Sequence, residues 1–249
     1  MLLFQPPTPT RYDLHFSVAG IQVRVHPLFW VIALLFGSAS NDLIQILIWV
    51  VVVFLSILVH ELGHALAMRR YGLPSNIILY WGGGLTVPEQ VKWGYTRANV
   101  SLRPNQEIFI SLAGPFSGFL VAGLIMVGVA AAGGEVFVRA LFGIIPVATA
   151  ILPISARIPN LFVATLLWVN IFWGYINLMP VYPLDGGNVA RYILLQADPW
   201  NGIRKSLWVS VVAGAIVAAA GLILMRSVFI ALLFGFLVFQ SYQSVRGRM

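Results

Sequence analysis

The chain has 249 residues, of which 59% are apolar and only 9% are charged. Because a soluble domain carries about 25% charged residues, this composition excludes an ordinary water-facing surface and predicts an integral membrane protein. The net charge of +7 does not indicate nucleic-acid binding, because the bases are scattered and form no cluster longer than Arg69-Arg70. There is no cysteine, so a metal site would have to use the four histidines or the eight acidic residues.

Apolar segments follow one another along the chain and can be compared with the roughly 20 residues that span a bilayer. Residues 1–25 are polar and contain prolines, and the alternation at 21–25 predicts a short strand. Residues 27–39 are apolar but short for a span. The longer apolar segments are 43–68, 108–132, 161–179, 206–225 and 228–242. The predicted fold class is an all-α polytopic membrane protein with about six transmembrane helices.

Two segments do not fit a simple spanning helix. Residues 77–81, the triplet Gly82-Gly83-Gly84 and residues 85–87 together predict a small membrane-associated β-hairpin around a glycine turn. Residues 136–153 are apolar but interrupted by Pro146, and we expect a partial or re-entrant membrane segment there.

The distribution of basic residues predicts the orientation, since cytoplasmic loops carry an excess of Lys and Arg. If the N-terminal side and the far side alternate along the predicted spans, twelve bases fall on the N-terminal side and three on the other. The twelve are Arg11, Arg24, Arg69, Arg70, Lys92, Arg97, Arg103, Arg191, Arg204, Lys205, Arg246 and Arg248, and the three are Arg139, Arg157 and Arg226. We therefore expect both termini to be cytoplasmic, with the plasma membrane as the expected location.

The expected span at 43–68 contains His60-Glu61-Leu62-Gly63-His64. Histidines at i and i+4 project from one face of a helix, one turn apart, so both can reach one metal ion. Glu61 lies beside that face and can touch a metal-bound water, as in the HExxH motif of zinc hydrolases. The alternative is a buried polar cluster that joins helices, but ionisable residues in a membrane helix are functional by default. The distance to Arg69 places the motif roughly 8–13 Å below the cytoplasmic interface.

A catalytic zinc site needs a third protein ligand and an open fourth position. His15 and His26 lie near the start of the chain, and His26 before Pro27 is typical of a structural or interfacial histidine. Asp185 follows the 161–179 segment on the cytoplasmic side and is flanked by Pro183 and Gly186-Gly187. Residue chemistry alone leaves two roles open for Asp185, a metal ligand or a cap or turn residue at the start of a short helix near 188–196.

The motif at 60–64 together with Asn177-Leu178-Met179-Pro180-Val181-Tyr182-Pro183-Leu184-Asp185-Gly186-Gly187 resembles the site-2 protease family, peptidase family M50. Members of that family of intramembrane zinc metalloproteases have HExxH on one transmembrane helix and N-x2-P-x4-DGG near the end of another. Ala113-Gly114-Pro115 and the triplet at 82–84 add to the resemblance, which covers roughly residues 43–190.

The resemblance implies that His60, His64 and Asp185 hold one Zn²⁺ and that Glu61 is the catalytic base. It also implies that Asn177 helps to hold the substrate or the developing oxyanion. Other expected contacts with the substrate are the hairpin glycines Gly82, Gly83 and Gly84, whose strand edge could pair with an extended peptide, and Asn170. Asn170 could instead bond between helices. One position departs from the family: Gly118 stands where members often carry asparagine, so no polar role is expected for that part of its helix.

By this resemblance, the chain is expected to hydrolyse peptide bonds within or near transmembrane segments, a form of regulated intramembrane proteolysis. Expected partners are a single-span or other membrane-protein substrate and the lipid bilayer, and no nucleic acid. We expect a single integral membrane protease domain over 1–249, with core 43–190, N-terminal segment 1–42 and C-terminal helices 206–242. Neither a PDZ nor a CBS domain is expected.

Two rival functions are less consistent with the sequence. A metal transporter would need ligands distributed through the membrane depth, whereas the candidate ligands form one compact cluster. A catalytically inactive relative would lack some zinc or base positions, whereas all of them are filled here.

Overall fold

The computed structural model describes residues 7–89, 102–141 and 145–247 of the chain. It consists of two compact units. The N-terminal unit contains residues 2–98 and 116–174, and the C-terminal unit contains residues 99–115 and 175–249. Helices α3 (Pro104–Ala131) and α4 (Arg157–Leu178) each contribute residues to both units. Lys92, Arg97 and Arg248, which enter the orientation argument, lie outside the described residues.

Within the described residues, five helices are long and apolar enough to cross a membrane: α2 (Leu43–Arg70), α3, α4, α6 (Gly202–Ile223) and α7 (Val228–Arg246). The protein is therefore a mostly helical, multi-pass membrane protein, as the sequence predicts. Helix α1 (Pro27–Gly37) has 11 residues, which gives a length of about 16 Å, roughly half of a hydrocarbon core. The predicted count of about six thus includes one helix that is too short to cross unaided.

The ends of the membrane helices are fixed by polar residues. Asp42 caps α2, its side chain accepting a hydrogen bond from the backbone N–H of Ile44 at 2.9 Å. The same carboxylate pairs with Arg157 at the start of α4, which joins the first turns of these two helices. Arg69 and Arg70 lie in the last turn of α2, where positive charge is favourable to the helix dipole.

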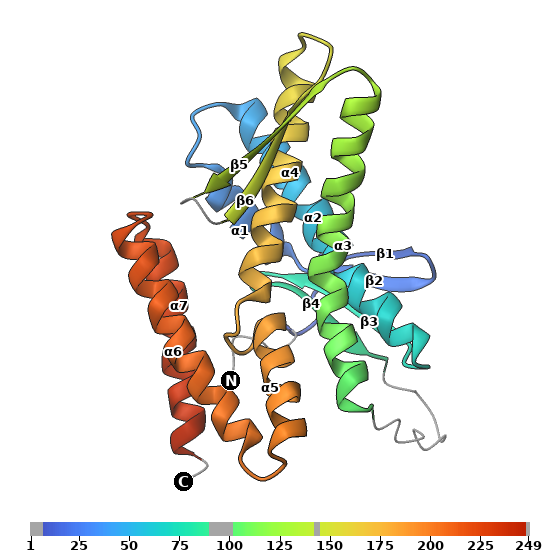
Figure 1. The fold of residues 1–249 in the computed structure, drawn as a ribbon. Coiled ribbons are helices and arrows are strands. Elements are labelled where there is room, and N and C mark those ends of the chain that lie inside the picture. The colour runs from blue at the N-terminus through green and yellow to red at the C-terminus, as the bar shows by residue number, and fades with distance from the viewer. Residues whose placement is uncertain (1–6, 90–101, 142–144, 248–249) are drawn as a thin grey trace. The chain divides into compact units, whose positions relative to one another are not determined.

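A four-stranded sheet in the N-terminal unit has the order β1-β2-β3-β4 (Figure 1). Its strands are Leu14–Val18, Ile21–Val25, Ser75–Tyr80 and Gly83–Pro88. The sequence predicts a strand at 21–25 and the hairpin formed by β3 and β4, and both are confirmed. The parallel pairing of β2 with β3, with Val23 opposite Ile77, brings these segments into one sheet. The residues before α1 and the residues after α2 therefore lie at the same end of this unit.

The core of the N-terminal unit fixes α2 against this sheet. Strand residues with almost no exposure contact helix residues from α1 and the second half of α2. The strand residues are Ile21, Val23, Val25, Ile77 and Leu79, and the helix residues are Phe29, Ile57, Leu58 and Ala65. Since His60 and His64 lie within the same stretch of α2, the β3–β4 hairpin is held at a defined position beside them.

The segment expected to be a partial or re-entrant membrane segment forms a β-hairpin (Figure 1). Strand β5 (Glu135–Leu141) pairs antiparallel with β6 (Ile145–Ile151), so this segment is not a spanning helix. The physical reason is local: the segment is rich in β-branched residues, and Pro146 is tolerated in a strand of a two-stranded sheet, where every strand is an edge.

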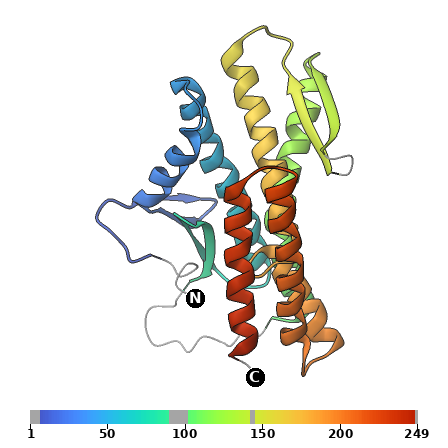
Figure 2. The same ribbon diagram turned by 90° about the vertical axis from the view of Figure 1, so that its left-hand side faces the viewer.

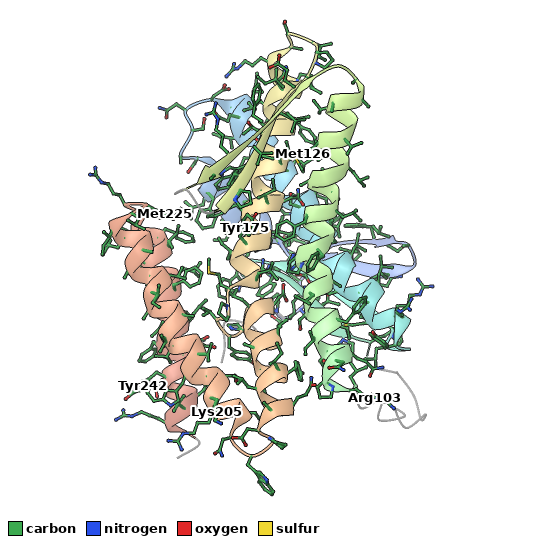
Figure 3. The ribbon with its side chains drawn as sticks, in the orientation of Figure 1. Arg103, Met126, Tyr175, Lys205, Met225 and Tyr242 are labelled. Carbon is green, nitrogen blue, oxygen red and sulfur yellow. The ribbon has the colours of Figure 1, made fainter. Side chains whose placement is uncertain are left out.

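The C-terminal unit contains α5 (Asp185–Ala197) and the antiparallel pair α6 and α7, which lie side by side in Figures 1 and 2. Figure 3 shows Lys205 and Tyr242 at one end of this pair and Met225 at the other. Between α4 and α5, the fully buried Val181 packs with Phe234 and Leu237 of α7. This contact anchors the segment that leads to Asp185.

Candidate metal centre

His60 and His64 lie on one face of α2 and are both buried, with 5% and 9% of their surface exposed. Their Nε2 atoms are 3.1 Å apart and their rings meet edge to face. Two ligands of one tetrahedral zinc ion, each about 2.0–2.1 Å from the metal, lie about 3.3 Å apart. The observed separation therefore suits two ligands of a single ion, and also a hydrogen bond between neutral rings of complementary tautomers.

Asp185 lies in the first turn of α5, and the N-cap position belongs to Leu184. Asp185 is therefore not the N-cap residue of α5, which was one of the roles that the sequence left open. Its position is fixed by the two glycines that follow, because a Cβ on Gly186 would run into the backbone of Leu178 and Met179. A Cβ on Gly187 would likewise lie 2.6 Å from the carbonyl oxygen of Val181.

His60 and His64 in the N-terminal unit and Asp185 in the C-terminal unit each offer one potential ligand atom. Two imidazole nitrogens and one carboxylate oxygen form a three-ligand set of the kind that catalytic zinc sites use. The donor chemistry therefore fits a zinc ion. His26 has a different role, since its Nδ1 accepts a hydrogen bond from the backbone N–H of Leu28 and caps α1, which confirms the structural interpretation of this histidine.

Glu61 is buried, with 6% of its surface exposed, and contacts strand β4. The hydroxyl of Thr86 lies 2.7 Å from its Oε2 atom and 3.1 Å from its backbone oxygen. The Cα of Gly84 lies so close to the carboxylate that a Cβ there would be 2.6 Å from Cδ of Glu61. The sequence does not single out Thr86, because a contact between residues 25 positions apart leaves no local pattern.

Two of the hairpin glycines, Gly82 and Gly84, are closely packed, whereas Gly83 has a positive φ of 109°. A Cβ on Gly82 would lie 2.9 Å from the ring of Tyr80, whereas Gly83 and Gly84 already belong to β4. The turn is therefore tighter than the triplet alone suggests. Burial, with the negative charge of Glu61 as a second cause, raises the pKa of Tyr80 to about 12, so this phenol remains neutral. Among the described residues, strand β4 stands at one edge of the four-stranded sheet.

The two asparagines predicted for the site are both buried. Asn170 donates from Nδ2 to the hydroxyl of Ser56 on α2 at 2.9 Å and to the carbonyl of Leu166 at 2.9 Å, so it bonds between helices. A Cβ on Gly118 would lie 3.4 Å from Oδ1 of Asn170. Asn177 lies in the last turn of α4. Contact of either amide with a substrate stays a prediction.

The fold and the ligand group define a polytopic membrane protein with a candidate metal centre that includes two histidines of a membrane helix. The family model of peptidase family M50 matches residues 48–219. That match covers more than half of the chain, and the chain therefore belongs to peptidase family M50.

The chain is also similar to a zinc metalloprotease of Methanocaldococcus jannaschii, with 26% identity over 183 residues. The match covers 72% of this chain and 44% of that relative, so the chain spans less than half the length of the curated protein that it matches. Among solved structures, the site-2 protease from the same organism shares the fold, with a TM-score of 0.55 and 22% identity. That likeness covers 94% of this chain and 95% of the other.

Proposed function

We propose that this chain is an intramembrane zinc metalloprotease that hydrolyses peptide bonds within or near transmembrane segments of membrane proteins. The observation that carries the proposal is the group His60, His64 and Asp185, with Glu61 next in sequence, in a membrane protein of peptidase family M50. The name of the curated relative, a zinc metalloprotease, agrees with this function.

His60, His64 and Asp185 are the proposed ligands of one zinc ion. When bound, zinc supplies Lewis acidity, which acidifies water and polarises a carbonyl group. The two histidines are held by α2, whose second half packs against the sheet, and Asp185 is held by the close packing of Gly186 and Gly187. Within each unit, these supports restrict the orientation of the proposed ligands.

Glu61 is the proposed general base. It accepts a proton from the attacking water and passes that proton to the leaving amine of the cleaved peptide bond. Asn177, near the end of α4, is proposed to donate from its side-chain amide to the substrate or to the developing oxyanion.

The proposed substrate enters as an extended strand. A peptide bond in a membrane helix is protected by its own hydrogen bonds, and unwinding leaves N–H and C=O groups that cost several kcal/mol each in lipid. The outer edge of β4 offers backbone partners for such groups, and strand addition to an edge is a recurring mode of peptide recognition. Gly82 just before this strand, together with Gly83 and Gly84 at its start, lets a second backbone approach closely.

The proposed orientation places both termini and the metal centre near the cytoplasmic side of the plasma membrane. It is supported by the twelve-to-three distribution of bases. It is also supported by the pairing of β2 with β3, since the segments before α1 and after α2 lie at one end of their unit. The proposed protease machinery is one integral membrane domain with residues 43–190 as its core.

The test is cleavage of a single-span membrane substrate by the purified chain in liposomes. Cleavage should stop with a zinc chelator and return when zinc is restored. His64→Ala should be inactive, whereas His15→Ala, which removes an exposed histidine of β1, should remain active. Cleavage that persists in the chelator, or zinc uptake into the liposomes without cleavage, would contradict the proposed function.

A further inference from the structure

The side chain of Glu61 is held by strand β4, in the same unit as α2. The Thr86 hydroxyl carries a single proton and lies near two acceptors of Glu61, the carboxylate Oε2 at 2.7 Å and the backbone oxygen at 3.1 Å. A carboxylate is the stronger acceptor when ionised, and its oxygen is also the nearer of the two. The proton therefore goes to the carboxylate, and this bond fixes the orientation of the Glu61 side chain.

Gly84 provides the space that this orientation needs. Residues 84 and 86 lie on the same face of β4, because side chains alternate along a strand. Gly84 has no side chain and therefore leaves room for the Glu61 carboxylate. The Thr86 hydroxyl donates a hydrogen bond to the same carboxylate. A Cβ on Gly84 would meet Cγ, Oε1 and Cδ of Glu61, the last at 2.6 Å.

The strand that carries both residues is itself rigid. Gly84 pairs with Leu79 and Thr86 pairs with Ile77 across the β3–β4 hairpin. Leu79 and Ile77 are fully buried in the core that also contains residues of α2. The distance between β4 and the helix turn of Glu61 is therefore set by core packing and not by the flexible carboxylate.

We infer that Thr86 is a positioning residue for Glu61, and that Gly84 makes room for the held carboxylate. The inference rests on the proposed function, because it assigns a support to the proposed base. The same strand offers its outer edge to the proposed substrate, so β4 orients the base and presents an edge to the peptide. Thr86 acts through Glu61 and has no chemical step of its own.

The test compares Thr86→Val, which keeps the β-branched shape and removes the hydroxyl, with Thr86→Ser, which keeps the hydroxyl. Loss of a hydrogen bond to a charged group predicts a fall in kcat on the order of 10- to 100-fold for the valine variant. KM and zinc content should remain at the wild-type level, and serine should restore most of kcat. Thr149→Val, the same change at an exposed strand position of β6, should leave kcat unchanged.

Wild-type kcat in Thr86→Val would overturn the inference, and so would an equal loss in Thr86→Ser. If the valine variant does not fold, Gly84→Ala decides: lower kcat with zinc retained supports the inference, and wild-type kcat overturns it. The two proposals fail differently. A wild-type chain that does not cleave refutes the proposed function, whereas an active wild type with an equally active Thr86→Val refutes only the role of Thr86.

Discussion

Replacing Gly186 by alanine tests whether close backbone packing holds the proposed ligand Asp185. The added Cβ would overlap the backbone of Leu178, and it would lie 2.6 Å from the carbonyl oxygen of Met179. These neighbours are backbone atoms, so no side chain can rotate away to make room. The start of α5 has to move.

Packed Cβ atoms essentially never come closer than 3.0 Å to another heavy atom, so the first turn of α5 must shift by at least about 0.4 Å away from Met179. Metal–ligand distances tolerate only about 0.2 Å. A shift of twice that size next to Asp185 should weaken zinc binding on the order of 10- to 100-fold, the range seen when the supports of metal ligands are removed.

The assay is zinc affinity, measured by competition with a chromophoric chelator on purified Gly186→Ala in detergent. Gly123→Ala is the matched control, since a Cβ on Gly123 in α3 would meet nothing within 4 Å. The control should bind zinc as the wild type does. Wild-type zinc affinity in Gly186→Ala would refute the view that this packing positions Asp185.

Three further predictions concern other parts of the structure. Asp185→Ala should lower the zinc content well below one ion per chain, and full occupancy would show that Asp185 is no ligand. Ser56→Ala removes one of the two hydrogen-bond acceptors of Asn170, the one on the neighbouring helix. It should destabilise the protein by about 0.6 kcal/mol in a reversible unfolding assay in detergent, the average for such bonds between membrane helices. A gain in stability would contradict this. The side chain of Lys205, together with the backbone N–H of Asn201, lowers the pKa of Asp198 to about 2. Because the folded pKa lies below the unfolded value of about 3.9, this pair stabilises the fold above pH 4 and loses its effect as the pH falls towards 2. Asp198→Asn should remove this part of the pH dependence, which unfolding measured between pH 5 and pH 2 would detect, and an unchanged profile would contradict the assignment.

The sequence predicts the membrane helices to within a few residues, because a long apolar run has few other ways to satisfy its backbone in a bilayer. The expected span 43–68 is α2, Leu43–Arg70, and the expected span 206–225 is α6, Gly202–Ile223. The shared helix face of His60 and His64 could also be predicted from the sequence, because residues four positions apart lie on the same face of a helix.

Long-range strand pairing could not be predicted in the same way. Val23 pairs with Ile77, but an alternating pattern at 21–25 does not say which strand it will join. The segment from 136 to 153 has the apolar character of both a strand and a membrane helix, and such short runs are ambiguous by composition. The role of Thr86 could not be predicted from the sequence for a related reason, because it depends on where the core places β4 beside α2.

The measurement that tests the central claim most directly uses one preparation of Glu61→Gln, analysed for both metal content and proteolysis. Glutamine keeps the shape of the side chain but cannot accept the proton from water. We predict one zinc ion per chain, as in the wild type, and no cleavage of a single-span membrane substrate in liposomes. Cleavage at the wild-type rate by this zinc-loaded variant would contradict the assignment of Glu61 as the base of a zinc protease.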